Sequence, residues 1–301
     1  MRSFASILLA ITLLLGSGAA RADLEVVATT PDLASVAMAI GGAHAKVSAL
    51  ALPTQDPHWV DARPHLALKL ARADMLLVVG LGLEVGWLPT LLTGSRNLNV
   101  QNGGRGHVDC SELIEPLEVA QARIDRSQGD VHAGGNPHYM FDPRAAAQVI
   151  DGVAARMAVL DPPNAGTYRA NAASFKTRLA TARIGWEKQL SGLRGAKVID
   201  YHKSFPYLES WLGFHVVEHL EPRPGIPPNP RHVAQVLALA KQQKVRIVLQ
   251  ESFYPDRTGQ LVATQAGAKL VRIPAGPDLS ARQGYIEFMG QVVALLRGAT
   301  D

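Results

Sequence analysis

The sequence predicts an α/β fold of two lobes, each a parallel sheet flanked by helices, joined by one long rigid central helix. Apolar, β-branched runs that end at turns alternate with helical segments, which is typical of βαβ units. The same alternation occurs in both halves of the 301-residue chain, a length that suits two medium domains. Between the halves lies a segment, residues 161–193, that has no proline after its opening Asp-Pro-Pro.

The first half, residues 23–160, reads as an N-terminal α/β lobe. Short runs rich in Val, Leu and Ala predict its strands, and longer runs with helical periodicity predict its helices. Strands are expected at 24–30, 46–50 and 74–80, and helices at 31–42, 64–73 and 141–157. Between the last strand and the last helix, residues 121–138 are polar and glycine-rich, and we expect a mobile loop there.

The second half, residues 194–301, repeats this order after the linking helix at 161–193. At a rise of 1.5 Å per residue that helix would be roughly 40 Å long, enough to brace two lobes. Strands are expected at 196–202, 214–220, 245–251 and 269–274, and the main helices at 205–213, 230–244, 257–267 and 284–298. The segment therefore predicts a C-terminal α/β lobe of the same architecture.

Residues 1–22 have the features of a cleavable signal peptide. Arg2 provides a positive start, an apolar stretch follows, and small residues at Ala20 and Ala22 place cleavage before Asp23. The apolar stretch is short for a membrane span, which needs about 20 residues. We therefore expect a protein exported to the periplasm.

The net charge and the cysteine content argue against nucleic-acid binding and against an internal disulfide. The net charge is +4, and removal of residues 1–22 takes away Arg2 and Arg21 to leave +2, which gives no footprint for nucleic acid. The single cysteine, Cys110, cannot form an internal disulfide, so a buried core must stabilise the chain. We expect a monomer.

Four side chains are candidate metal ligands. His58 in "DPHWVDARP" follows a predicted strand, His138 lies in "NPHYMFDP", His202 ends the strand at 196–202, and Asp278 follows the last strand. The carboxyl ends of parallel strands are where α/β proteins collect ligands. Three imidazoles and one carboxylate suit tetrahedral Zn²⁺, whereas Mg²⁺ and Ca²⁺ prefer oxygen donors.

A structural role for some of the histidines is an alternative to metal binding. A histidine at a strand end is often only a hydrogen-bonded structural residue, which is how we interpret His215 and His219. His132 is an intermediate case because it lies in the polar loop close to His138. Glu251 is a candidate to support a ligand, and the fourth ligand could be Asp278, Glu251 or water. No nucleophile elbow, P-loop or dinucleotide-binding turn is found.

Taken together, several segments resemble the metal-binding solute-binding proteins of bacterial ABC importers for zinc and manganese. The likeness spans nearly all of the chain after residue 22, and the segments that carry it are "DPHWVDARP", "NPHYMFDP", "DPPN", "YHKSFPYL", "EPRPGIPPNP", "VLQESFYP" and "GYIEFM". The resemblance implies two lobes joined by a rigid helix with the metal between them. It implies His58, His138 and His202 as the first three ligands and Asp278 as the fourth.

The same resemblance implies a zinc-type member that is not an enzyme and that delivers Zn²⁺ to a membrane permease. Manganese-type relatives tend to carry Glu where His202 stands, and zinc members often have a long His-rich loop where this chain has only His132. A manganese-binding member of the same family, a secreted zinc hydrolase and a binding protein for an organic ligand are the alternatives. A periplasmic metallochaperone stays open as a second partner.

Overall fold

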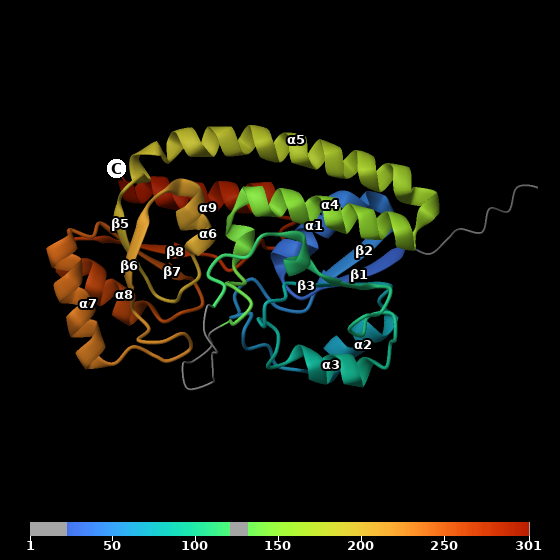
Figure 1. Cartoon of the computed structure of the whole chain (residues 1–301), viewed down its shortest axis with the longest axis horizontal. Coiled ribbons are helices and arrows are strands. Elements are labelled where there is room, and N and C mark those ends of the chain that lie inside the picture. The colour runs from blue at the N-terminus through green and yellow to red at the C-terminus, as the bar shows by residue number, and fades with distance from the viewer. Residues whose placement is uncertain (1–22, 121–131, 301) are drawn as a thin grey trace, which may run out of the picture.

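The computed structural model describes residues 23–120 and 132–300, which form two four-stranded parallel sheets (Figure 1). The first sheet has the order β2-β1-β3-β4 and the second β6-β5-β7-β8, so both halves place their strands in the same sequence. The strands of the first sheet are β1 (Leu24–Ala28), β2 (Ala45–Ala49), β3 (Met75–Val78) and β4 (His107–Asp109). Those of the second are β5 (Lys197–Asp200), β6 (His215–His219), β7 (Ile247–Glu251) and β8 (Lys269–Ile273). The α/β fold class is confirmed.

Helices cover the faces of both sheets, so β3 and β7 are buried along their whole length. Around the first sheet lie α1 (Pro31–Gly41), α2 (Pro64–Arg72), α3 (Leu88–Ser95) and α4 (Pro143–Leu160). Around the second lie α6 (Pro206–Leu212), α7 (Pro230–Gln243), α8 (Asp256–Ala266) and α9 (Tyr285–Thr300). Many of them begin with proline, which lacks the N–H that a first helical turn leaves unpaired.

The helix α5 (Ala165–Gln189) has 25 residues and runs along one side of the molecule, past both sheets (Figure 1). It packs against α1 and α4 in the first half and against α9 in the second. Its buried side chains, among them Tyr168, Phe175 and Trp186, lie on the face turned towards these helices. The predicted long helix is confirmed, although short 3₁₀ turns at Pro162–Asn164 and Ser191–Leu193 replace its two ends.

One apolar core is shared by the two halves. A single cluster of buried side chains includes residues of α1 and α4, of α5, and of α6 and α9. The rings of Phe141 and Phe205, from different halves, have centroids 5.2 Å apart. Two smaller clusters lie under α2 and α3 and between the second sheet and α7 and α8. The halves are therefore joined by packing as well as by α5.

Some expectations differ from the structure or lie outside it. The strand β4 and the helix α3 were not predicted, and β4 is only three residues long. Residues 1–22 and 121–131, the expected signal peptide and most of the expected mobile loop, lie outside the described residues.

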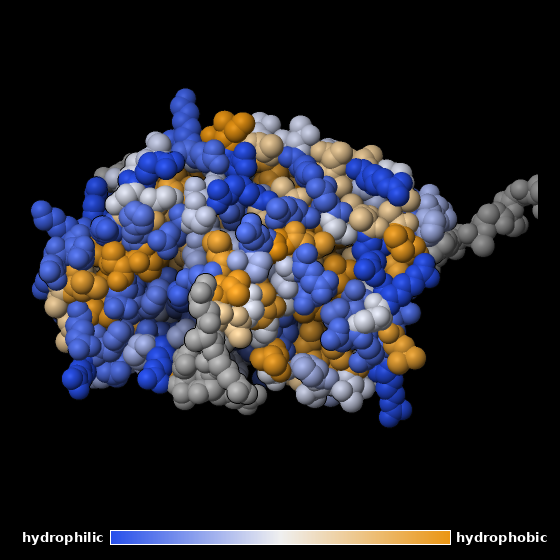
Figure 2. Space-filling view, in the orientation of Figure 1, coloured by the Kyte–Doolittle hydropathy of each residue, from blue (hydrophilic) through white to orange (hydrophobic). Residues whose placement is uncertain are grey.

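In the parts that are described, no helix combines the length and apolar character needed to cross a membrane. On the face in Figure 2, hydrophilic and hydrophobic residues are interspersed.

Candidate metal site

Three histidines from distant parts of the chain converge between the two sheets. His58, His138 and His202 each offer a ring nitrogen, and these nitrogens all lie within 4.8 Å of one another. The centroids of the three rings are 5.2 to 5.6 Å apart. His58 follows β2, His138 directly precedes the turn before α4, and His202 follows β5. The structure thus brings together three of the four predicted ligands, two from the first half of the chain and one from the second.

The two Pro-His-aromatic segments use the same local turn. The backbone N–H of His58 donates to Oδ1 of Asp56 (2.9 Å), and that of His138 donates to Oδ1 of Asn136 (3.0 Å). An Asp or Asn side chain that accepts from the residue two positions later is an Asx turn, and the intervening proline restricts the backbone further. The first turn is also held by the Nε1–H of Trp87, which donates to the carbonyl of Pro57 (2.9 Å). Both histidines are therefore held by rigid backbone.

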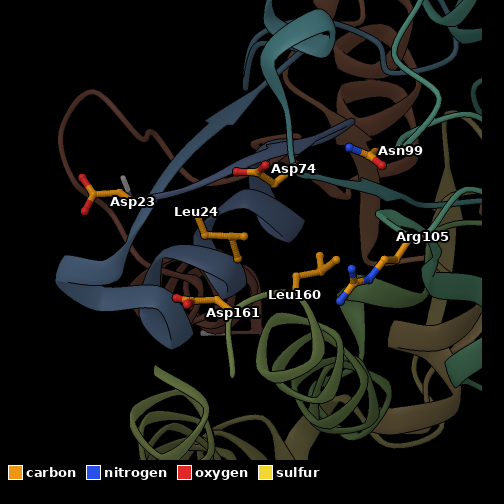
Figure 3. Close-up of a pocket in the computed structure, with 7 residues that line it drawn as sticks. All are labelled: Asp23, Leu24, Asp74, Asn99, Arg105, Leu160 and Asp161. Atoms are coloured by element: carbon orange, nitrogen blue, oxygen red, sulfur yellow. The ribbon is translucent and has the colours of Figure 1, made fainter. Parts of the chain in front are cut away.

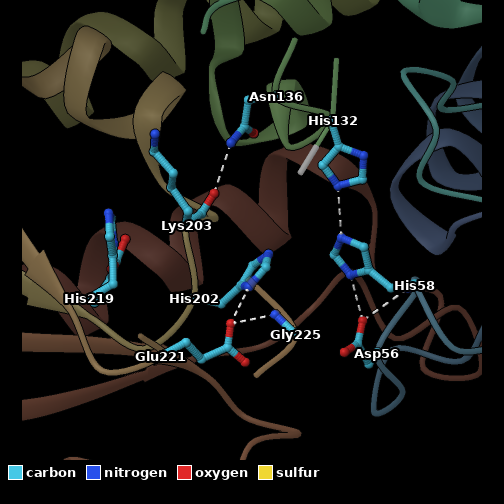
Figure 4. Close-up of polar contacts among 10 residues, drawn as sticks. Asp56, His58, His132, Asn136, His202, Lys203, His219, Glu221 and Gly225 are labelled. Atoms are coloured by element: carbon cyan, nitrogen blue, oxygen red, sulfur yellow. Dashed lines mark hydrogen bonds and ion pairs between the residues drawn. The ribbon is translucent and has the colours of Figure 1, made fainter. Parts of the chain in front are cut away.

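Carboxylates fix the orientation of two of the rings (Figure 4). Nδ1 of His58 lies 2.8 Å from Oδ1 of Asp56, and Nδ1 of His202 lies 2.7 Å from Oε2 of Glu221. Because a carboxylate only accepts, each Nδ1 carries the proton, and Nε2 is the ring nitrogen through which each of these two histidines would bind a cation. Within the described residues, the buried Nε2 of His138 has no hydrogen-bond partner.

Burial sets the charge state of these rings. It lowers the pKa of His138 well below the usual value, and neighbouring His58 and His202 lower it further. For His202 burial also lowers the pKa, but the hydrogen bond to Glu221 and its negative charge outweigh this and leave the pKa raised. His138 is therefore neutral and ready to bind a metal, whereas a protonated His202 must lose a proton before it can bind one, so protonation competes with metal binding there.

Two further donors lie beside the three histidines. Nε2 of His132 is 3.3 Å from Nε2 of His58 (Figure 4). Two nitrogens bound to one tetrahedral zinc at about 2.0–2.1 Å would be separated by about 3.3 to 3.4 Å. Glu251, buried at the end of β7, carries an Oε2 without a hydrogen-bond partner among the described residues. Burial raises the pKa of Glu251 to about 7, although the nearby positive charge of His202 acts to lower it.

Asp278 does not join this group. Its side chain is exposed, and its Oδ1 accepts hydrogen bonds from Ser280 N (2.9 Å), Ser280 Oγ (2.6 Å) and Ala281 N (3.3 Å). These contacts close a turn after β8 and engage one of the two carboxylate oxygens. Asp278 is not in the group of described side chains whose donor atoms lie within 4.8 Å of one another, and its coordination of a metal stays a prediction.

The remaining histidines of the second sheet have structural partners. Nδ1 of His219 contacts Oδ1 of the buried Asp200, and Nε2 of His232 lies 2.9 Å from the carbonyl of His219. His215 is exposed at the start of β6. The structural interpretation of His215 and His219 agrees with these contacts.

A cavity of about 310 Å³ lies at the other end of the first sheet (Figure 3). Its lining residues include Leu24, Asp74 and Arg105, which lie at or just before the amino ends of β1, β3 and β4. The histidines lie beyond the carboxyl ends of strands, so this cavity is separate from the metal site.

Comparison with known proteins identifies the family. Residues 26–299 match the family model described as "Zinc-uptake complex component A periplasmic". The "Iron-binding protein YfeA" of Yersinia pestis is 24% identical over 279 residues, which cover 89% of this chain and 84% of that protein. The "Manganese-binding lipoprotein MntA" of Bacillus subtilis is 26% identical over 276 residues (89% and 82%). The "High-affinity zinc uptake system protein ZnuA" of Bacillus subtilis is 22% identical over 253 residues (80% and 76%).

Solved structures show the same fold. The structure titled "Crystal structure of ZnuA" superposes with a TM-score of 0.77 at 22% identity and covers 93% of this chain and 100% of that one. A manganese-bound periplasmic metal-binding protein from Candidatus Liberibacter asiaticus gives a TM-score of 0.74 at 17% identity (92% and 99%).

Two similar lobes, a long joining helix and a histidine cluster between them define a metal-binding solute-binding protein of an ABC importer. The chain belongs to the ZnuA family of periplasmic metal-binding components of such importers. This family consists of transport proteins that act with a membrane permease and not of enzymes, so the expectation of a non-catalytic site is confirmed and a secreted zinc hydrolase is excluded.

Proposed function

We propose that the protein binds Zn²⁺ through His58, His138 and His202 and delivers it to the permease of an ABC importer. The observation that carries this proposal is the convergence of three imidazoles within 4.8 Å, with Nδ1 of two of them already committed to carboxylates. Neutral imidazole is a preferred zinc ligand, and a carboxylate on the opposite ring nitrogen raises its basicity.

The choice of zinc over manganese or iron rests on the chemistry of the donors. Relatives of similar identity are named for iron, manganese and zinc, so similarity alone leaves the metal open. Manganese prefers carboxylate, carbonyl and water oxygens, whereas imidazole suits zinc. A manganese-binding member of the family is the alternative.

His132 is a further candidate for the fourth donor. Its Nε2 lies 3.3 Å from Nε2 of His58, and burial lowers its pKa to about 4, so the ring is neutral at physiological pH. Asp278, Glu251 and a water molecule are the other candidates. Replacement of each side chain in turn, His132→Ala, Glu251→Gln and Asp278→Asn, separates them, because only loss of a true ligand weakens zinc binding strongly.

The first test is a competition titration of metal-stripped protein with zinc and manganese against a chelator of known affinity. We expect tight one-to-one zinc binding that is lost in His138→Ala and unchanged in His215→Ala, which removes an exposed histidine of β6. Zinc binding that survives His138→Ala would refute the assigned site. A zinc-to-manganese affinity ratio no larger than the general order of divalent-metal affinities gives would select the manganese alternative.

We also propose that residues 1–22 are removed on export to the periplasm and that the mature protein is a monomer. The apolar stretch and the small residues at Ala20 and Ala22 support the cleavage. Mass spectrometry of the secreted protein would place its first residue at Asp23. Light scattering on a size-exclusion column would give the mass of one chain.

A further inference from the structure

The side chain of Asn136 makes three hydrogen bonds, one of which connects the two halves of the molecule. Its Oδ1 accepts from the backbone N–H of His138 (3.0 Å), within the first half of the chain. Its Nδ2 donates to the carbonyl of Lys203 (2.8 Å) in the second half and to Oε2 of Glu118 (3.2 Å). Asn136 is only 7% exposed. Because one side-chain atom must accept and the other must donate, these partners determine which atom is Oδ1 and which is Nδ2.

One end of this connection is a proposed metal ligand, and the other end is the residue next to one. His138 is itself in the histidine cluster, and Lys203 follows directly after His202. Figure 4 shows the contact between Asn136 and the carbonyl of Lys203 close to the His202 side chain. The distance between the backbones that carry His138 and His202 is therefore spanned by one amide group.

Neighbouring contacts hold both sides of the connection in place. Nζ of Lys203 lies 2.7 Å from Oε1 of Glu118, so the two residues bound by Nδ2 of Asn136 are also paired with each other. The hydroxyl of Tyr207, on α6, donates to the carbonyl of Asn136 (2.9 Å) and accepts from the N–H of Leu117 (2.9 Å). The amide of Asn136 is thus the central member of a hydrogen-bond network between the first half and α6.

We propose that Asn136 is a positioning residue that sets the spacing of His138 and His202 and thereby the rate at which the bound metal leaves. The inference rests on the proposed metal site. A ligand pair held at the spacing that the metal requires loses little freedom on binding, and groups that orient ligands affect metal affinity by roughly 10- to 100-fold. Asparagine is suited to this role because its side chain both accepts from His138 and donates across to Lys203.

The decisive variant is Asn136→Ser, which is neutral and keeps a hydroxyl oxygen that can accept from the N–H of His138. Its side chain is too short to reach the carbonyl of Lys203, so the local turn is kept and the connection between the halves is lost. Asn136→Asp is a second variant that keeps the turn and cannot donate. Asn171→Ser is the matched control, because Nδ2 of Asn171 also donates to a backbone carbonyl, that of Ile40 (2.9 Å), but between α5 and α1.

The measurement is the zinc dissociation rate, obtained by stopped-flow mixing of loaded protein with excess chromophoric chelator, together with the visible spectrum of the Co²⁺-substituted protein. We expect dissociation about 10-fold faster or more in Asn136→Ser and a changed Co²⁺ spectrum, and neither effect in Asn171→Ser. The melting temperature of each metal-free variant separates lost stability from lost positioning. Asn136→Asp gives the same readout if the serine variant does not fold.

Wild-type dissociation rates and Co²⁺ spectra in the Asn136 variants would overturn this inference while leaving the metal site intact. Equal acceleration in Asn136→Ser and Asn171→Ser would also overturn it, because the effect would then follow stability alone. Failure of the wild-type protein to bind one zinc ion would instead refute the proposed function.

Discussion

Nδ1 of His202 lies 2.7 Å from Oε2 of Glu221, and the two side chains are only 4% and 6% exposed. Glu221 follows β6, the strand next to the one that leads to His202, and its Oε2 also accepts from the N–H of Gly225 (2.9 Å). This carboxylate therefore fixes the His202 ring in the orientation that a metal ligand needs.

Glu221→Gln tests this support directly. The amide is neutral and accepts more weakly, so we expect zinc affinity to fall roughly 10- to 100-fold. Glu218→Gln, on the neighbouring strand β6, is the control that removes a similar charge without touching His202. Isothermal or chelator-competition titration at fixed pH measures the difference, and equal affinities in both variants would contradict a supporting role for Glu221.

Metal preference should depend on the ligand at position 202. His202→Glu alone would place two buried carboxylates together, so it is combined with Glu221→Gln, whose amide can donate to the new carboxylate. We expect the zinc-to-manganese affinity ratio to fall by about tenfold relative to Glu221→Gln alone, because a carboxylate suits manganese better than imidazole does. Competition titrations with both metals measure the ratio, and an unchanged ratio would count against donor chemistry as the source of selectivity.

Stability should fall as pH rises because of Glu84, a buried carboxyl group in the turn after β3. Burial raises the pKa of Glu84 to about 7 from an ordinary 4.5, despite hydrogen bonds from Thr29, Val79 and Gly80 that lower it. Between these two values the folded state holds a proton that the unfolded state has released, so the free energy of unfolding declines as pH increases. The loss attributable to this group is roughly 2 to 4 kcal/mol and is complete above pH 7.

Glu84→Gln should remove that part of the pH dependence. Denaturant unfolding of metal-free wild type and variant from pH 5 to pH 8 gives the comparison, since zinc would add its own pH-dependent stabilisation. We expect the variant to gain stability relative to wild type as pH rises through this range. A constant difference between the two proteins at every pH would show that Glu84 has an ordinary pKa in the folded state.

Zinc binding should change the overall shape very little. The core shared by α1, α4, α6 and α9, together with α5, joins the two halves over a broad surface and resists hinge bending. We expect X-ray scattering profiles of metal-free and zinc-bound protein to superimpose, with release achieved by local movement of loops. A clear decrease in the radius of gyration on zinc binding would contradict this.

Sequence patterns were sufficient for most of the fold and for the three histidines that the structure brings together. Long apolar runs of period two or helical period identified most strands and helices, and the positions of His58 and His202 after strands placed them at one edge of the sheets. The strand β4 was missed because a three-residue run carries no readable period, and α3 was missed because it follows a glycine-rich turn without a usual cap.

The groups that support the ligands could not be found in the same way. Glu221 is 19 residues from His202 along the chain, and Asn136 is 67 residues from Lys203, so each pairing depends on how strands and helices pack. Asp56 is the exception, because an Asp-Pro-His segment is itself a turn signal. Asp278 follows a strand, as His58 and His202 do, but nothing in the sequence indicated that its carboxylate would close a local turn.

The shared core also determines when the metal site can exist during folding. His58 and His138 come from the first half and His202 from the second. The apolar core that joins the two halves contains side chains from both. Neither half could bury its part of this core alone, so a chain lacking α9 would expose the apolar faces of α1 and α5. The three histidines can therefore come together only in a chain whose two halves have packed against each other, which makes the site a property of the complete core and not of either half.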